Sequence, residues 1–380
     1  MEKNMYLKEI ELKNFRNYKE LSLSFHERVN IITGNNAQGK TNLLESLYIM
    51  SLGKSFRTSR DSEMIAFGET FSRAKSKTCK DGENLEIEIV ISKEGKSVKI
   101  DGVKAKKTAD LLECVYMVVF SPEDLKIVKD EPERRRKFLD RELCQLKPVY
   151  YKNLGSYKKV LQNRNILLRR GEANRELFSV YDEKLAEYGS KIIWERLQFV
   201  KKIDRISRDI HGKITNEKET FKVSYEGELS DGEKLEELGV QEAVRRIRRE
   251  LLERLQSSFR KDLARGSTGA GPHRDDLRLE IDGVDIRHYG SQGQQRTAAL
   301  SLKLAEIYLI KQETGEDAIL LLDDVLSELD IERQTFLLNR LKNVQIFITT
   351  AELSEDLFSS LSESMVFFVE KGTVKRLEKG

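Results

Sequence analysis

The 380-residue chain contains only three cysteines, four prolines and one tryptophan. Cys79, Cys114 and Cys144 are odd in number and lack C-x-x-C spacing, so they predict neither a disulfide framework nor a zinc site. The scarcity of proline and the lack of low-complexity tracts argue against a disordered linker. No segment approaches the roughly 20 apolar residues of a membrane span, and residues 1–14 lack the apolar stretch of a signal peptide. We therefore expect a cytoplasmic protein with reduced thiols.

The charge of the chain is nearly balanced. Charged residues make up 34% of the sequence, yet the formal net charge is only +3. This balance argues against a surface that is basic throughout and leaves room for local basic faces. The hydrophobic fraction of 39% is sufficient for a buried core, and the length suggests two or three structural units.

The periodicity of apolar residues changes twice along the chain. Strand-like runs occur at 7–12, 21–25, 29–33, 85–91 and 116–120, and again at 277–281, 319–322, 344–350 and 365–369. Between them the spacing is helical, and one face of a long helix is predicted by Leu185, Tyr188, Ile192, Phe199, Ile203, Ile206 and Ile210. The sequence therefore predicts an α/β domain formed from both ends of the chain, residues 1–121 and 267–380, with a helical arm or lid, residues 122–266, inserted between them.

A phosphate-binding loop follows the predicted strand at 29–33 and precedes a predicted helix at 41–50. It matches G-x-x-x-x-G-K-[ST], and its residues are Gly34, Asn35, Asn36, Ala37, Gln38, Gly39, Lys40 and Thr41. Glycines let successive backbone N–H groups face the phosphates, and the helix N-terminus adds partial positive charge. In this motif the lysine reaches the β and γ phosphates and the threonine hydroxyl binds Mg²⁺. The loop predicts binding of ATP with Mg²⁺.

Two carboxylates end the apolar run at 319–322. The run is apolar on both faces, as expected of a central parallel strand, and ligands of such sheets bind at the carboxyl ends of the strands. We expect Asp323 to bind Mg²⁺ and Asp324 to orient or deprotonate the attacking water. The alternative is that both residues only end the strand in a turn.

Two further segments resemble motifs of ABC-type ATPase heads. Residues 289–296, YGSQGQQR, resemble the signature motif, and residues 327–330, SELD, resemble the D-loop. In that superfamily the signature serine and glycine of one subunit close over the γ-phosphate held by the other. The resemblance thus implies an ATP-dependent homodimer in which Ser291, Gly293, Gln294 and Asp330 complete the partner's site.

Within that superfamily the chain resembles the RecF family over nearly its whole length. The matching strings are LKNFRNY at 12–18, GKTNLLE at 39–45, GKSFR at 53–57, FSPEDL at 120–125, GPHRDD at 271–276 and the signature itself. The resemblance implies binding to duplex DNA and gap junctions, partnership with RecR and RecO, and loading of RecA in gap repair, replication restart and the SOS response. Alternatives are a chromosome-maintenance or repair-nuclease head, which needs a far longer coiled coil, and a transporter ATPase subunit.

The sequence departs from the superfamily pattern in two places. Asp324 stands where many relatives carry glutamate, and residues 348–350 lack the switch histidine of transporter ATPases. Both departures favour a weak ATPase in which ATP acts as a timed clamp of the dimer. With the resemblance to the RecF family, we expect this activity to be stimulated by DNA.

One long stretch carries charge of a single sign. No acidic residue lies between Glu142 and Glu172, whereas the stretch contains Lys147, Lys152, Lys158, Lys159, Arg164, Arg169 and Arg170. With interleaved tyrosines, this pattern predicts contact with DNA phosphates. The basic clusters at 134–137 and 245–249 are flanked by acids and are more typical of solvated helix faces.

Three other residues could take part in chemistry. Arg57 lies in a loop near the nucleotide motif and could serve ATP or DNA. For His273 and Arg274 no serine or cysteine partner is identifiable, which favours a structural or domain-coupling role.

Overall fold

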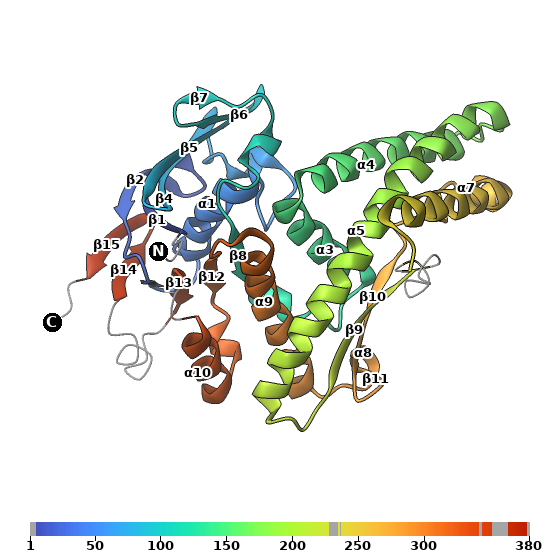
Figure 1. The fold of residues 1–380 in the computed structure, drawn as a ribbon. Coiled ribbons are helices and arrows are strands. Elements are labelled where there is room, and N and C mark those ends of the chain that lie inside the picture. The colour runs from blue at the N-terminus through green and yellow to red at the C-terminus, as the bar shows by residue number, and fades with distance from the viewer. Residues whose placement is uncertain (1–4, 228–234, 236, 342–343, 352–363, 378–380) are drawn as a thin grey trace. The chain divides into compact units, whose positions relative to one another are not determined.

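The computed structural model describes residues 5–227, 235, 237–341, 344–351 and 364–377 (Figure 1). The chain divides into two compact units, Met1–Lys126 with Leu302–Gly380, and Ile127–Ser301. The first unit thus joins both ends of the chain, in line with the sequence pattern. The expected boundaries at 121/122 and 266/267 do not match this division, because the second unit extends to Ser301. None of the described helices is both long enough and apolar enough to cross a membrane.

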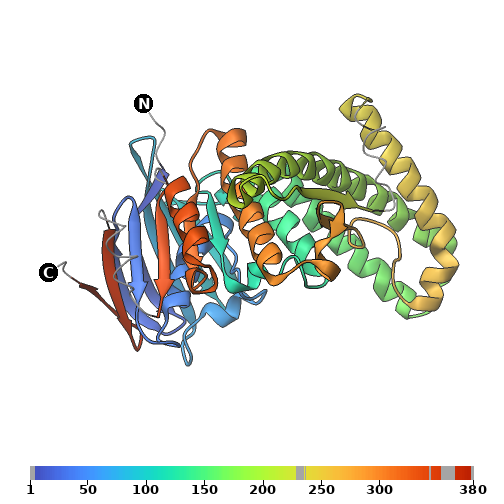
Figure 2. The same ribbon diagram turned by 90° about the horizontal axis from the view of Figure 1, so that it is seen from below.

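The first unit contains a mixed six-stranded sheet in the order β15-β14-β3-β13-β12-β8. The strands are β3 (Val29–Thr33), β8 (Met117–Phe120), β12 (Ile319–Asp323), β13 (Ile346–Thr350), β14 (Ser364–Glu370) and β15 (Thr373–Leu377). All pair in parallel except β15. Strand β12 lies between β13 and β8 and is buried along its length, as its apolar run predicts. In Figure 2 the orange and red strands from the end of the chain lie beside blue strands from its beginning.

An antiparallel sheet of six strands completes the β-structure of the first unit, in the order β2-β1-β4-β5-β6-β7. The strands are β1 (Met5–Phe15), β2 (Tyr18–Ser24), β4 (Phe71–Lys80), β5 (Glu83–Ser92), β6 (Gly95–Ile100) and β7 (Val103–Lys104). The sequence pattern missed β4. Its buried face carries small side chains, Ser72, Ala74, Ser76 and Thr78, and its other face carries arginine and lysines. Small buried residues alternate with charged exposed ones along β4, and a search for alternating hydrophobic residues does not detect this pattern.

Helix α1 (Lys40–Leu52) packs against strands of both sheets and is buried on nearly all sides. A second link between the sheets is the amide of Gln345, which is only 2% exposed. Its Oε1 accepts from the N–H of Leu7 (2.7 Å), and its Nε2 donates to the carbonyls of Leu7 (2.9 Å) and His26 (2.8 Å). Phe25 adds an edge-to-face contact with Phe347, with ring centroids 4.9 Å apart. The two sheets therefore share one core.

Short helices connect these strands. They are η1 (Asp61–Met64), η2 (Thr108–Leu111), α2 (Pro122–Leu125), η3 (Leu326–Glu328) and α10 (Ile331–Arg340). Helix α9 (Gln292–Thr314) begins in the second unit and ends in the first.

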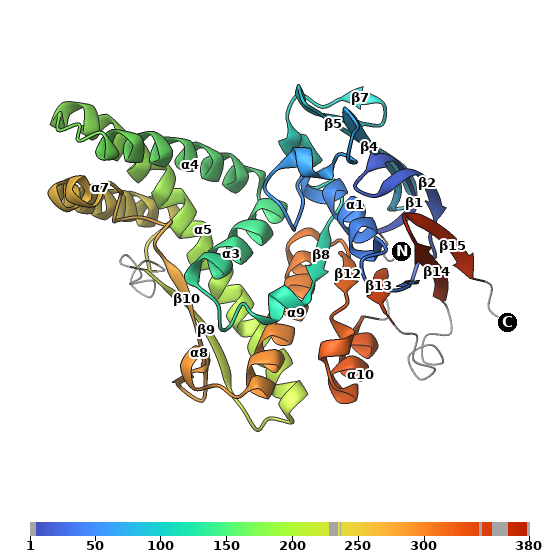
Figure 3. The same ribbon diagram turned by 180° about the vertical axis from the view of Figure 1, so that it is seen from behind.

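The second unit is built mainly from α3 (Pro132–Leu146), α4 (Pro148–Arg169), α5 (Arg175–Thr215) and α7 (Val240–Arg265). Figures 1 and 3 show α4 and α7 running alongside α5. The predicted helical face is confirmed, because all its aliphatic and phenylalanine members are buried: Leu185, Ile192, Phe199, Ile203, Ile206 and Ile210. The helical period therefore identified α5.

The second unit also contains a sheet that the sequence pattern did not predict there. Strand β9 (Phe221–Glu226) pairs antiparallel with β10 (Asp276–Ile281), which pairs with β11 (Val284–Asp285). The short helix α8 (Ile286–Tyr289) follows. The strand expected at 277–281 is present as β10 but lies in the second unit, and β9 lies within the range expected to form a helical arm. Six alternating residues are too short a signal between long helices.

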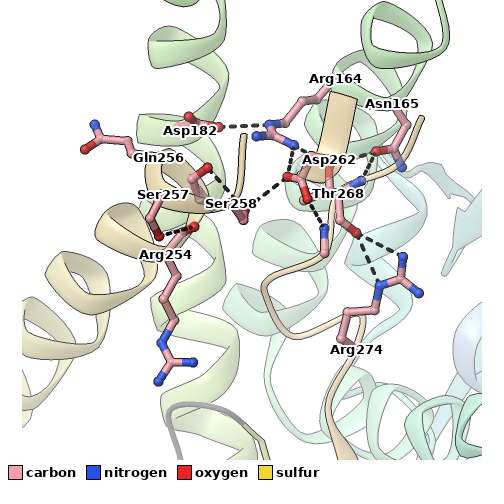
Figure 4. A network of polar contacts seen from close by, with 12 residues as sticks. Arg164, Asn165, Asp182, Arg254, Gln256, Ser257, Ser258, Asp262, Thr268 and Arg274 are labelled. Atoms are coloured by element: carbon pink, nitrogen blue, oxygen red, sulfur yellow. Dashed lines mark hydrogen bonds and ion pairs between the residues drawn. The ribbon is translucent and has the colours of Figure 1, made fainter. Parts of the chain in front are cut away.

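A buried polar network links α4, α5 and α7 (Figure 4). Arg164 is fully buried, and its Nε and Nη1 donate to Asp182 Oδ1 and Asp262 Oδ2, each at 2.8 Å. Nη1 also donates to the hydroxyl of Thr268 (2.8 Å). Burial raises the pKa of Asp182, and Arg164 opposes that rise. Removal of the guanidinium would leave two carboxylates in the interior, so the arginine fixes the packing of the three helices.

His273 belongs to the same region and is held on both ring nitrogens. Nε2 lies 3.0 Å from the carbonyl of Thr268, which can only accept, so Nε2 carries the hydrogen. Nδ1 then accepts from the hydroxyl of Tyr157 at 2.7 Å. Arg274 donates to the same carbonyl through Nε (3.2 Å) and Nη2 (3.0 Å). These contacts fit the structural or domain-coupling role favoured by the sequence.

Burial lowers the pKa of His273 from 6.5 to about 4. We therefore predict that the free energy of unfolding depends on pH in this range. Between these values the unfolded chain binds a proton that the folded chain does not. Stability is therefore lost as pH falls from 6.5 towards 4, by up to about 1.4 kcal/mol per pH unit. His273→Gln, which retains a donor and an acceptor, should remove this contribution. Urea unfolding followed by fluorescence of the single tryptophan, Trp194 in α5, measures it. Parallel pH profiles for the two proteins would contradict the assignment.

Candidate functional site

The phosphate-binding loop joins β3 to α1. Gly34 (φ 141°) and Gly39 (φ 122°) adopt backbone conformations that other residues rarely reach. A Cβ at Gly39 would lie 2.5 Å from Nδ2 of Asn17, and one at Gly34 would collide with the carbonyl of Val369. Glycine is therefore required at both positions, because a side chain would collide with neighbouring atoms and because φ is positive. The loop is further held where the N–H of Lys371 donates to Oε1 of Gln38 (2.8 Å).

Lys40 begins α1, and its ammonium lies over the loop. Nζ donates to the carbonyls of Gly34 and Asn35, the latter at 3.1 Å. Burial lowers the pKa of Lys40, and the negative charges of Asp324 and Asp323 oppose that shift. An ammonium held here, beside the N-terminus of a helix, adds a point charge to a site already suited to anions.

Asp323 ends β12 and accepts two hydroxyl hydrogen bonds at the same oxygen. Oδ1 lies 2.8 Å from Oγ1 of Thr41 and 3.0 Å from Oγ1 of Thr349. The residue is only 8% exposed, and this burial raises the pKa of its carboxyl, while the two hydroxyls and Arg57 lower it. A carboxylate oxygen beside a hydroxyl is the hard oxygen donor set that Mg²⁺ prefers. Thr41 and Asp323 thus fit the metal role expected of them.

Asp324 follows at φ 54°, a left-handed conformation that turns the chain out of β12. Its N–H donates to Oγ1 of Thr349 (2.9 Å), so Thr349 ties both acidic residues to β13. Thr349 was not predicted as a site residue. Its only signal was a polar residue near the end of an apolar strand.

A second polar cluster surrounds the first turns of α1. The carboxylate of Glu45 is fully buried and accepts from Arg16 Nε (2.8 Å) and Nη2 (2.7 Å). Arg57 Nη1 donates to Asn42 Oδ1 (2.6 Å), and Asn42 in turn donates to Asn17 Oδ1 (2.8 Å). Arg57 therefore lies beside the first turns of α1, close to the phosphate-binding loop. Arg16, Glu45 and Asn17 were not predicted as site residues.

The signature segment opens α9 in the second unit with a reciprocal pair of hydrogen bonds. The N–H of Ser291 donates to Oε1 of Gln294 (3.0 Å), and the N–H of Gln294 donates to Oγ of Ser291 (3.2 Å). Ser291 and Gly293 are exposed. The accepting hydroxyl still carries its own hydrogen, so it can donate to an incoming phosphate.

The D-loop segment lies in the first unit. Asp330 caps α10, where its Oδ1 accepts from the N–H of Arg333 (3.0 Å). The next residue, Ile331, is 77% exposed. Asp330 is exposed as well, and its carboxylate also pairs with the Arg333 guanidinium.

The structure divides the predicted basic stretch into three groups. Five of its residues are exposed on α4 and the turn after it: Lys152, Lys158, Lys159, Arg169 and Arg170. Lys147 pairs with Glu195, and Lys158 pairs with Asp140 (3.2 Å). Arg164 is buried in the network described above, so its inclusion in the DNA surface was wrong. The sequence shows the sign of each charge, but not that Asp182 and Asp262 on other helices pair with Arg164 in the interior.

Known proteins resemble the chain along its length. A family model described as "RecF/RecN/SMC N terminal domain" matches residues 6–375. The chain is 44% identical over 374 residues to the DNA replication and repair protein RecF of Clostridium novyi (strain NT), covering 98% of this chain and 100% of the relative. The corresponding RecF of Alkaliphilus oremlandii (strain OhILAs) is 44% identical over 371 residues, covering 97% and 100%.

A solved structure described as "the recombination mediator protein RecF-ATP in RecFOR pathway" matches with a TM-score of 0.88 and 40% identity. The match covers 99% of this chain and 98% of that one. These similarities confirm the expected α/β fold of an ABC-type ATPase head.

Proposed function

The chain belongs to the RecF family, and on this basis we propose that it is an ATP-dependent recombination mediator that binds duplex and gapped DNA. Support comes from the contact between Thr41 and Asp323, which joins the phosphate loop to the acidic strand (2.8 Å). With Lys40 these residues form the part of an ATP site that one subunit supplies. RecR and RecO as partners, RecA loading and a cytoplasmic location belong to the same proposal and derive from the family.

Mg²⁺ is part of the proposed site. Thr41 and Asp323 would hold it, and the metal would neutralise phosphate charge. Asp324 is proposed to orient or deprotonate water at the edge of this site. The left-handed backbone at Asp324, fixed by Thr349, sets the direction from which its carboxylate acts.

Asp323→Asn tests the metal assignment. The amide keeps the shape but loses the charge, so Mg²⁺ affinity of the nucleotide complex should fall at least about tenfold. Titration of a fluorescent ATP analogue with and without Mg²⁺ measures this. Asp317→Asn, which removes a carboxylate paired with Lys311 two residues before β12, is the matched control. An unchanged Mg²⁺ dependence in Asp323→Asn would remove the residue from the metal site.

ATP-dependent dimerisation is proposed from the likeness to ABC-type heads, in which the signature of one subunit closes over the nucleotide of the other. Lys40, Thr41 and Asp323 lie in the first unit, whereas Ser291 directly precedes α9 and Gln294 lies in its first turn, in the second unit. An exposed helix N-terminus with a serine hydroxyl is suited to an anion. We propose that it closes over the γ-phosphate of the partner subunit, with Asp330 and Gly293 at the same contact.

Ser291→Arg should abolish ATP-dependent dimerisation while leaving ATP binding by the single subunit unchanged, because the bulky side chain blocks only the signature surface. Sedimentation velocity with ATP and gapped DNA gives the dimer fraction, and the fluorescent analogue gives ATP affinity. Lys40→Met serves as the opposite control, since it should lose both. A Ser291→Arg protein that dimerises with ATP like the wild type would disprove the shared site.

The DNA surface is proposed on α4. Lys152 and Lys159 are seven residues apart, which places them on the same side of the helix, and both are exposed. Arg169 and Arg170 extend the same positive charge to the end of α4. Such a surface binds phosphates without reading bases, so affinity should depend on salt more than on DNA sequence.

Lys152→Ala combined with Lys159→Ala should reduce the slope of log K against log salt by about 2, because about one counterion is released per phosphate contact. Fluorescence anisotropy with duplex DNA at several salt concentrations measures the slope. Lys184→Ala with Lys191→Ala removes the same charge from α5, where both lysines pair with Glu187, and should leave the slope unchanged. Equal slopes in wild type and the α4 variant would exclude this surface.

Hydrolysis is proposed to be weak and stimulated by DNA. Asp324 in place of glutamate, and residues 348–350 without a histidine, both favour ATP as a clamp that is released slowly.

A further inference from the structure

The signature glutamine contacts a carboxylate that the ATPase motifs do not include. Gln294 Nε2 donates to Oε1 of Glu219 at 3.0 Å. Glu219 belongs to the turn between α5 and β9, far from α9 in sequence but in the same compact unit. The turn is tight, with Asn216 (φ 52°) and Glu217 (φ 58°) both left-handed. A turn with so few allowed conformations gives Glu219 a defined position.

A buried histidine holds the other oxygen of the same carboxylate. His211 Nε2 lies 3.1 Å from Oε2 of Glu219, and the ring is fully buried. It stacks on Phe221, with centroids 5.1 Å apart and an interplanar angle of 29°. Nδ1 lies 3.3 Å from Oγ of Ser301, which itself donates to the carbonyl of Thr297 (2.8 Å) on α9. The carboxylate is thus fixed between α5, β9 and α9.

The chemistry of the amide explains what Glu219 does to the signature. A glutamine amide can rotate by half a turn and exchange its donor and acceptor ends. An ionised carboxylate only accepts, so Glu219 selects the orientation with Nε2 towards itself. Oε1 then faces the N–H of Ser291, with which it forms the 3.0 Å hydrogen bond. Without Glu219, rotation of the amide would place two donors against each other at Ser291.

We propose that Glu219, anchored by His211, is a positioning residue that orients Gln294 and Ser291 for the partner's ATP. This inference rests on the proposed function, in which the signature closes over the γ-phosphate. Glu219 does not touch the nucleotide in this scheme. It acts only through Gln294, and this property separates it from a residue that merely stabilises the fold.

A double-mutant cycle tests the proposal. Glu219→Ala should weaken ATP-dependent dimerisation and slow hydrolysis by about tenfold, the usual effect of losing a hydrogen bond to a charged group. ATP affinity of the single subunit should stay within about twofold, because the phosphate loop is untouched. In a Gln294→Ala background, Glu219→Ala should have no further effect. Sedimentation velocity, phosphate release and nucleotide titration supply the three readouts.

Glu219→Gln is the conservative variant, since its carbonyl oxygen can still accept from Gln294 while His211 changes tautomer. It should retain dimerisation and hydrolysis within about threefold of the wild type. Lys218→Ala, an exposed neighbour in the same turn, is the matched control. Thermal unfolding of each variant shows whether the fold is intact, and Glu219→Gln replaces Glu219→Ala in the cycle if the alanine variant unfolds early.

The outcomes separate the two claims. Additive effects of Glu219→Ala and Gln294→Ala, with Ser291→Arg still unable to dimerise, would overturn the positioning role and leave the proposed function standing. Normal ATP-dependent dimerisation of Ser291→Arg would overturn the shared site itself, and the positioning role with it. Non-additivity together with unchanged ATP affinity supports both.

Discussion

The buried carboxylate of Asp323 links the sheet order of the first unit to its nucleotide site. A charge that is nearly removed from water is tolerated only when polar partners surround it. Asp323 ends β12, and its two partners are Thr41, in the helix that follows β3, and Thr349, near the end of β13. The parallel register that aligns Leu322 with Ile348 and Ile348 with Ile31 brings these ends to one edge. The contacts of Asp323 therefore form only when β3, β13 and β12 pair in this order.

Sequence reasoning succeeded where local pattern and global fold agree. The phosphate loop, β12 and the long face of α5 each have a strong signal of their own, namely a motif, an apolar run and a helical period. It failed where the role of a residue depends on side chains that the fold places beside it and that are distant in the sequence. Strand β4 buries serine, threonine and alanine, and Arg164 looks like any other basic residue until Asp182 and Asp262 are placed beside it. Thr349 and Glu219 are ordinary polar residues whose contacts cross long sequence separations.

The basic stretch illustrates how one pattern serves two physical purposes. A run without acids on α4 contains exposed lysines and one arginine that is essential to the interior of the second unit. The compensating acids lie on α5 and α7, outside the run. Charge counted along the chain therefore overstates the charge on the surface. Burial also explains His273. A histidine in water has a pKa of 6.5, whereas burial lowers the pKa of His273 to about 4.

The sheet order has a consequence for how the protein is synthesised. Strand β3 leaves the ribosome early, yet both of its neighbours, β13 (Ile346–Thr350) and β14 (Ser364–Glu370), come from the last part of the chain. Until those residues emerge, an apolar strand and the loop after it lack the edges on which they pair. The nascent chain thus carries an incomplete first unit through nearly the whole of translation, while the intervening unit, residues 127–301, can fold ahead of it. A premature stop shortly before residue 346 would leave the nucleotide motif intact in sequence and without a sheet to hold it.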